Sequence, residues 1–120
     1  MNVSTLVQSL NLRVYGGDAG LDKPLAGGYT SDLLSDVIGF ADAGYIWITL
    51  QTHKNILAVA SLKDLAAIVI VRGLAPDPDT LAQADAEGIP LLGTDCTAFE
   101  ITGQIYRALA AADAGNHNPR

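Results

Sequence analysis

Segments typical of β-strands alternate with segments typical of helices three times in the second half of this chain. The strand segments are 45–50, 67–71 and 89–92, and each is followed by a helical segment. Strand, crossover helix and parallel strand form a recurring unit whose sheet is covered by helices. The sequence therefore predicts an α/β fold, a three-layer α/β/α arrangement around a mostly parallel sheet of about four to five strands.

The first half of the chain adds shorter elements to this pattern. Apolar spacing predicts a helix over 2–10, strands over 11–15 and around 25–29, and a helix over 31–43 that ends at Gly44. The strand over 67–71 is apolar on both faces, so it should be central in the sheet. At 120 residues the chain is expected to form one domain over 1–114, followed by a flexible tail over 115–120.

Composition excludes several classes of function. The net charge is −6, and the seven Lys and Arg residues form no cluster, which argues against binding to nucleic acid or to an anionic membrane surface. Apolar runs fall short of the ~18 residues that a membrane span requires. The single cysteine, Cys96, excludes an internal disulfide, and we expect a cytoplasmic protein. We predict no cofactor and no metal, because His117 lies in the expected tail and His53 has no second histidine near it.

The most informative segment for binding begins with two glycines at a predicted strand end, followed by Ser and Asp residues that open a helix. Such corners present free backbone N–H groups, and the polar turn after the strand over 45–50 offers a second one. Free N–H groups favour an anionic ligand. The candidate ligand-binding residues are Tyr29, Thr30, Ser31, Asp32, Gln51, Thr52, His53, Lys54 and Asn55.

We predict no catalytic residue, although an alternative remains open. An enzyme would use His53 as a base for Ser31 or Cys96. Against this, Ser31 is not in a Gly-x-Ser-x-Gly elbow, and Ser31 or Asp32 can cap the following helix. His53 can likewise cap the helix that begins at Asn55. Trp47, in the middle of a strand, is expected to anchor the core.

The segment 29–106, about two thirds of the chain, resembles the DRTGG domain family. The matching blocks are 28–37, 47–56, 65–70, 73–78 and 87–92. The chain is also similar to the N-terminal domain of HPr kinase/phosphorylase and to the regulatory region of some phosphotransacetylases. The resemblance implies a three-layer α/β fold without catalytic activity of its own. Where multidomain relatives carry a Gly-Asp-Arg-like turn, this chain has Thr52-His53-Lys54.

These features together predict a non-catalytic regulatory or adaptor domain. We expect it to be a homodimer that binds a small anionic or nucleotide-like ligand or a partner protein. Besides the enzyme alternative, the chain could be a structural subunit of a redox or hydrogenase-associated complex, because single-domain members of the family resemble proteins encoded beside such subunits.

Overall fold

Five strands form one sheet in the order β1–β5–β4–β3–β2, in a computed structural model that describes residues 1–116 and side chains as far as residue 114. The strands are β1 Arg13–Gly16, β2 Gly27–Thr30, β3 Tyr45–Thr49, β4 Ala67–Ile70 and β5 Leu91–Gly93. Strands β2 to β5 are mutually parallel, and β1 pairs antiparallel with β5. The predicted α/β fold with a mostly parallel sheet is confirmed.

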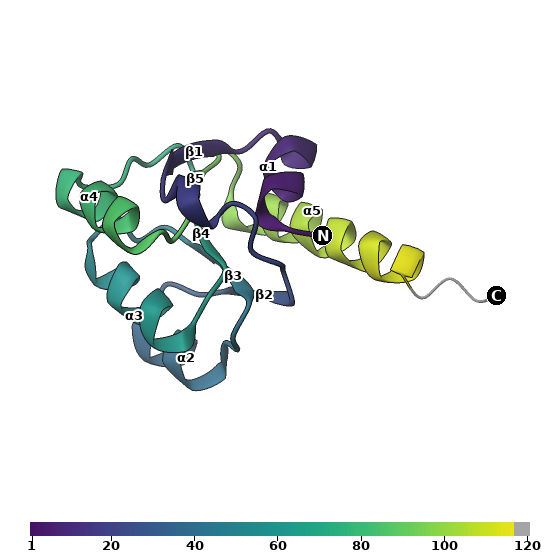
Figure 1. Ribbon diagram of the computed structural model, residues 1–120, viewed down its shortest axis with the longest axis horizontal. Coiled ribbons are helices and arrows are strands. Elements are labelled where there is room, and N and C mark those ends of the chain that lie inside the picture. The colour runs from purple at the N-terminus through teal and green to yellow at the C-terminus, as the bar shows by residue number, and fades with distance from the viewer. Residues whose placement is uncertain (117–120) are drawn as a thin grey trace.

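Helices cover both faces of the sheet (Figure 1). The crossover helices α2 Leu34–Phe40, α3 Asn55–Lys63 and α4 Pro78–Glu87 pack on one face, and α1 Val3–Leu10 and α5 Ala98–Asn116 pack on the other. A short 3-10 helix, η1 Asp18–Gly20, follows β1. Strands β2 to β5 are added in one direction across the sheet, so right-handed crossovers place α2, α3 and α4 on the same face.

The core is divided by β4, whose four residues are all buried. Ile68 and Ile70 belong to the cluster under α2–α4, and Ala67 and Val69 belong to the cluster under α1 and α5. The prediction of a central strand is confirmed. Trp47 of β3 is 0% exposed and its indole Nε1 donates a hydrogen bond to the Ser31 carbonyl at 2.8 Å, so the expected core anchor is also confirmed.

Helix α2 is shorter than the sequence predicts, seven residues in place of the segment 31–43. The capping role expected for Ser31 or Asp32 is wrong. The Ser31 hydroxyl accepts a hydrogen bond from the Leu33 amide, and an oxygen of Asp32 accepts one from the Leu50 amide. These bonds hold the chain extended as far as Leu33, and the helix starts after it.

Helix α5 begins with a capping box. The amide of Glu100 donates to the Thr97 hydroxyl at 3.2 Å, and Oε1 of Glu100 accepts from the Thr97 amide at 2.9 Å. The helix projects beyond the sheet (Figure 1) and continues through residues 115 and 116, which the sequence assigned to a tail. The rest of that predicted tail lies outside the described residues.

We expect the capping box to make stability depend on pH in the acid range. The hydrogen bonds from the backbone and side chain of Thr97 lower the pKa of Glu100 from its ordinary value of 4.5. A lowered pKa means that the folded state favours the carboxylate. The resulting stabilisation is therefore present above pH 4.5 and is lost as the pH falls through the lowered pKa.

The variant Glu100→Gln retains the acceptor oxygen without the charge. In urea unfolding at a series of pH values, the difference in free energy of unfolding between the wild type and this variant should shrink as the pH falls below 4.5. A difference that stays constant with pH would show that the charge of Glu100 does not contribute.

Candidate functional site

The two segments predicted to bind a ligand lie side by side at the carboxyl ends of β2 and β3. Oδ1 of Asp32 accepts hydrogen bonds from the Thr49 hydroxyl at 2.9 Å and from the Leu50 amide at 2.8 Å. The side-chain amide of Gln51 donates to the Asp32 carbonyl at 2.9 Å. We call these three contacts the Asp32 clamp, and they join the β2–α2 loop to the β3–α3 loop.

The backbone groups expected to be free for an anion are largely used within the protein. The Ser31 amide donates to the Ile48 carbonyl, and the Asn55 amide donates to Nδ1 of His53 at 3.2 Å. The next two amides of α3 donate to the carbonyls of His53 and Lys54. Free N–H groups at the β2–α2 and β3–α3 loops therefore do not support an anionic ligand there.

The strand order also bears on whether a ligand crevice can form at the carboxyl ends of the strands. Open α/β sheets have a ligand crevice where the strand order reverses, beyond the carboxyl ends of the strands. Strands β2 to β5 follow one another without a reversal. At this edge of the sheet the loops pack against neighbouring elements. The Thr52 carbonyl accepts hydrogen bonds from the Thr80 hydroxyl and from the Asp77 amide, which ties the β3–α3 loop to α4.

A groove of about 1110 Å³ lies instead between β2 and α5. Gly28 of β2 and Gly103 of α5 both line it, and a Cβ added at Gly103 would have no atom within 4 Å. The hydroxyl groups of Thr30 and Thr102 are hydrogen-bonded at 2.8 Å and fasten β2 to α5. Of the predicted site residues, Tyr29 and Thr30 line this β2–α5 groove, and those from Gln51 to Asn55 do not.

The aromatic residues of α5 that line this groove, Phe99 and Tyr106, were not among the predicted site residues. The sequence did contain a signal for them, because the final helix carries apolar residues on more than one side. Ile101 and Ile105 fill its buried side and leave Phe99 and Tyr106 outside.

Tyr29 turns its side chain toward the other layer. Its hydroxyl donates to Oδ1 of Asp36 in α2 at 2.8 Å. That hydrogen bond, with smaller contributions from burial and from the charge of Asp36, raises the pKa of Tyr29 above its ordinary value of 10.0. The phenol is therefore a neutral donor that links β2 to α2.

The residues of the enzyme alternative are hydrogen-bonded to groups other than one another. Nδ1 of His53 accepts from the Asn55 amide, which is the capping role considered above. Ser31 accepts from the Leu33 amide, and the sulfur of Cys96 lies 4.0 Å from Nε2 of Gln104. Cys96 follows β5, and β4 separates that strand from β3, a spacing of roughly 10 Å. The geometry thus gives His53 no hydrogen bond to either nucleophile.

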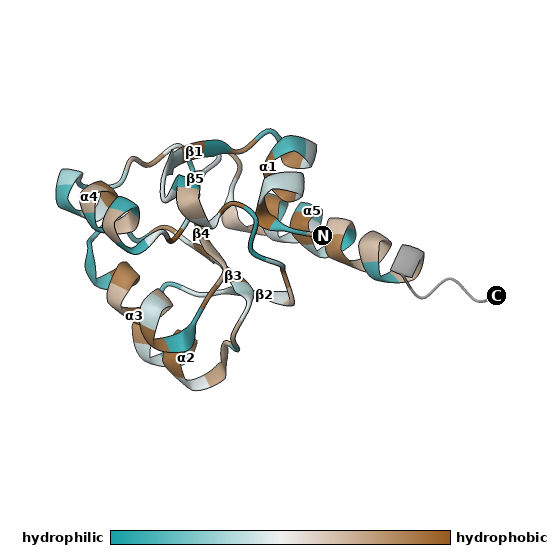
Figure 2. Ribbon diagram, viewed as in Figure 1, coloured by the Kyte–Doolittle hydropathy of each residue, from teal (hydrophilic) through white to brown (hydrophobic). Residues whose placement is uncertain are grey.

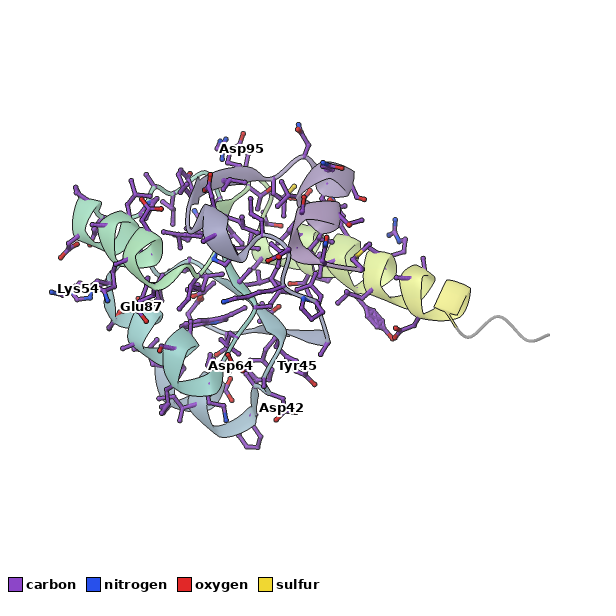
Figure 3. All side chains as sticks on the ribbon, in the orientation of Figure 1. Asp42, Tyr45, Lys54, Asp64, Glu87 and Asp95 are labelled. Carbon is purple, nitrogen blue, oxygen red and sulfur yellow. The ribbon has the colours of Figure 1, made fainter. Side chains whose placement is uncertain are left out.

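Two cations remain exposed at the carboxyl ends of neighbouring strands. Lys54 follows β3, and Arg72 follows β4. Arg72 has a φ of 61°, a left-handed conformation that is uncommon for a side chain of this size. Figure 3 shows Lys54 well away from Asp95, which is ion-paired with Arg13. Arg72 lies in the turn beside Asp95, since its amide donates to the Cys96 carbonyl and a Cβ at Gly73 would lie 3.1 Å from Oδ1 of Asp95. Lys54 and Arg72 have no such pairing within the described residues.

Within residues 1–116 we find no group of three acidic, histidine or cysteine side chains placed to hold a metal ion. The helices in the described part of the chain are too short or too polar to cross a membrane.

One comparison with solved structures is informative. The chain is similar to the CBS and DRTGG domains of the regulatory region of a Clostridium perfringens pyrophosphatase, solved in complex with the activator diadenosine tetraphosphate. The TM-score is 0.65 at 14% sequence identity, over 82% of this chain and 43% of that one. This chain thus spans less than half of that neighbour, and the likeness shows a DRTGG-like fold. Neither protein-family models nor curated protein sequences gave a match.

We expect the Asp32 clamp to contribute measurably to stability. Replacing Asp32 by Ala would remove the acceptor of the Thr49 hydroxyl, and Thr49 is 1% exposed. The loss should lower the free energy of unfolding by about 1–3 kcal/mol. Asp32→Asn keeps an acceptor oxygen and should retain most of the stability. Urea unfolding of both variants measures this, and an equal loss in both would contradict the clamp.

Proposed function

We propose that the chain is a non-catalytic regulatory domain that forms a homodimer and binds a small anionic, nucleotide-like ligand. The observation that carries the non-catalytic part is the use of Ser31, Asp32 and His53 as structural groups. Each of these side chains accepts a hydrogen bond from a backbone N–H group, and that bond shapes a loop or the start of a helix. The fold it shares with a regulatory region of a pyrophosphatase supports the same reading.

The ligand site of this proposal is the exposed surface formed by the β3–α3 and β4–α4 loops. Lys54 and Arg72 supply positive charge there, and the neighbouring His53 is also exposed. The left-handed backbone of Arg72 costs roughly 1–2 kcal/mol, and strain of this kind tends to occur where a side chain is needed in a special position. The pyrophosphatase region binds a diadenosine polyphosphate, and a ligand of that chemical class fits exposed cations better than an uncharged metabolite does.

Isothermal titration calorimetry with diadenosine tetraphosphate, ATP and inorganic pyrophosphate tests the ligand proposal, with adenosine as the uncharged control. At least one of the three anionic probes should bind, and adenosine should not. Lys54→Ala and Arg72→Ala should each weaken binding about tenfold, the loss expected for one charge-assisted hydrogen bond. The matched control is Lys63→Ala, at the opposite end of α3, and it should bind as the wild type does.

Arg72→Gly separates binding from stability. Glycine adopts a φ of 61° without strain, so the free energy of unfolding should rise by about 1 kcal/mol while binding weakens. If none of the anionic probes binds, or if Lys63→Ala weakens binding as much as Arg72→Ala does, the ligand site is refuted.

A further inference from the structure

One face of α5 is apolar and is left uncovered by the described part of its own chain. Phe99 is 90% exposed and Tyr106 is 69% exposed. Gly103 lies between these two residues, and Ala110 follows Tyr106. The successive spacings are four, three and four residues, which places all four side chains on one side of the helix. We call these four residues the α5 stripe. The opposite side of α5 is occupied, because Ile101 and Ile105 are buried in the core.

The α5 stripe alternates large and small residues, and this order complements itself when the helix is reversed. Along the chain it reads Phe99, Gly103, Tyr106, Ala110. In two antiparallel copies, Phe99 of one faces Ala110 of the other and Tyr106 faces Gly103, because each pair of numbers has the same sum. Every large side chain then meets a small one, as helix packing requires, and a two-fold axis repeats each contact.

Charges beside the stripe match in the same arrangement. Glu100 follows Phe99, and Arg107 follows Tyr106, so both flank the stripe on one side. Pairing two helices antiparallel brings Glu100 of one copy near Arg107 of the other, twice per dimer. The capping box uses Oε1 of Glu100 and lowers the pKa of its carboxyl group, so the side chain is charged near neutral pH.

The β2–α5 groove provides the space that a second helix needs. All four residues of the stripe line it, together with the edge strand β2. The absence of a side chain at Gly28 and Gly103 deepens it. Figure 2 shows apolar residues recurring along α5, including the part that projects beyond the sheet.

From these observations we infer that the α5 stripe is the homodimer interface, with a second copy of the chain as its occupant and the two α5 helices antiparallel across a two-fold axis. This inference rests on one part of the proposed function, the homodimer, and does not depend on the ligand site. Other exposed apolar side chains lie on the other layer, namely Leu33, Phe40 and Leu62. Those side chains come from two helices and a loop, and they do not form the reciprocal pattern of the α5 stripe.

Size-exclusion chromatography with light scattering on the full chain tests this inference. The wild type should have twice the 12.5 kDa mass of one chain. Gly103→Phe places a large side chain opposite Tyr106 of the second copy and should raise the dimer dissociation constant at least about tenfold. The variant should fold, because a Cβ at Gly103 enters open space. Gly39→Phe in α2 is the matched control, since its Cβ also meets no atom, and it should remain dimeric.

The double variant Gly103→Phe/Tyr106→Ala reverses the order of large and small in the centre of the stripe and should restore the dimer. A monomeric wild type would overturn both the homodimer and this interface. A Gly103→Phe variant that stays dimeric, or a double variant that stays monomeric, would overturn the interface and leave the homodimer standing. Loss of the dimer in Gly39→Phe alone would assign the interface to the α2–α3 surface instead.

Discussion

The constraint behind this architecture is that β4 must be covered on both faces. Its four residues are all buried, and a parallel strand built that way requires a helical layer on each side of the sheet. The three crossover helices share one face because the strands are added in one direction. The second layer therefore depends on α1 and α5, which lie outside the crossovers. Helix α5 covers the sheet with the side that carries Ile101 and Ile105, and its opposite side, which carries the apolar stripe, is left exposed.

The sequence predicted the elements whose causes are local. Local hydrophobic patterns were sufficient for the alternating strands and helices, for the apolar run of β4 and for the tryptophan of β3, because these apolar residues must be buried wherever they lie. The start of α2 could not be found in this way. Ser31 and Asp32 have the residue types of helix caps, but their partners are Leu33 and the end of β3. The partner of Asp32 lies on another strand, and its proximity depends on the tertiary fold.

The same limit applies to the candidate site. The sequence placed two polar corners together at the ends of β2 and β3, and the Asp32 clamp does join them. It did not indicate that their amides would be satisfied internally, because that depends on backbone geometry. Helical periodicity can show that a helix is apolar on two sides, as α5 is, but the β2–α5 groove also requires the edge position of β2. That position follows from strand order, which local patterns do not contain.

The Asp32 clamp and the Thr30–Thr102 bond are separated along the chain by Ser31 alone. A short continuous path therefore runs from the β3–α3 loop through the end of β2 to α5. Residues 30–32 thus anchor one loop and one helix that lie far apart along the chain. A substitution that alters the backbone of this stretch would therefore remove supports of the β3–α3 loop and of α5 together.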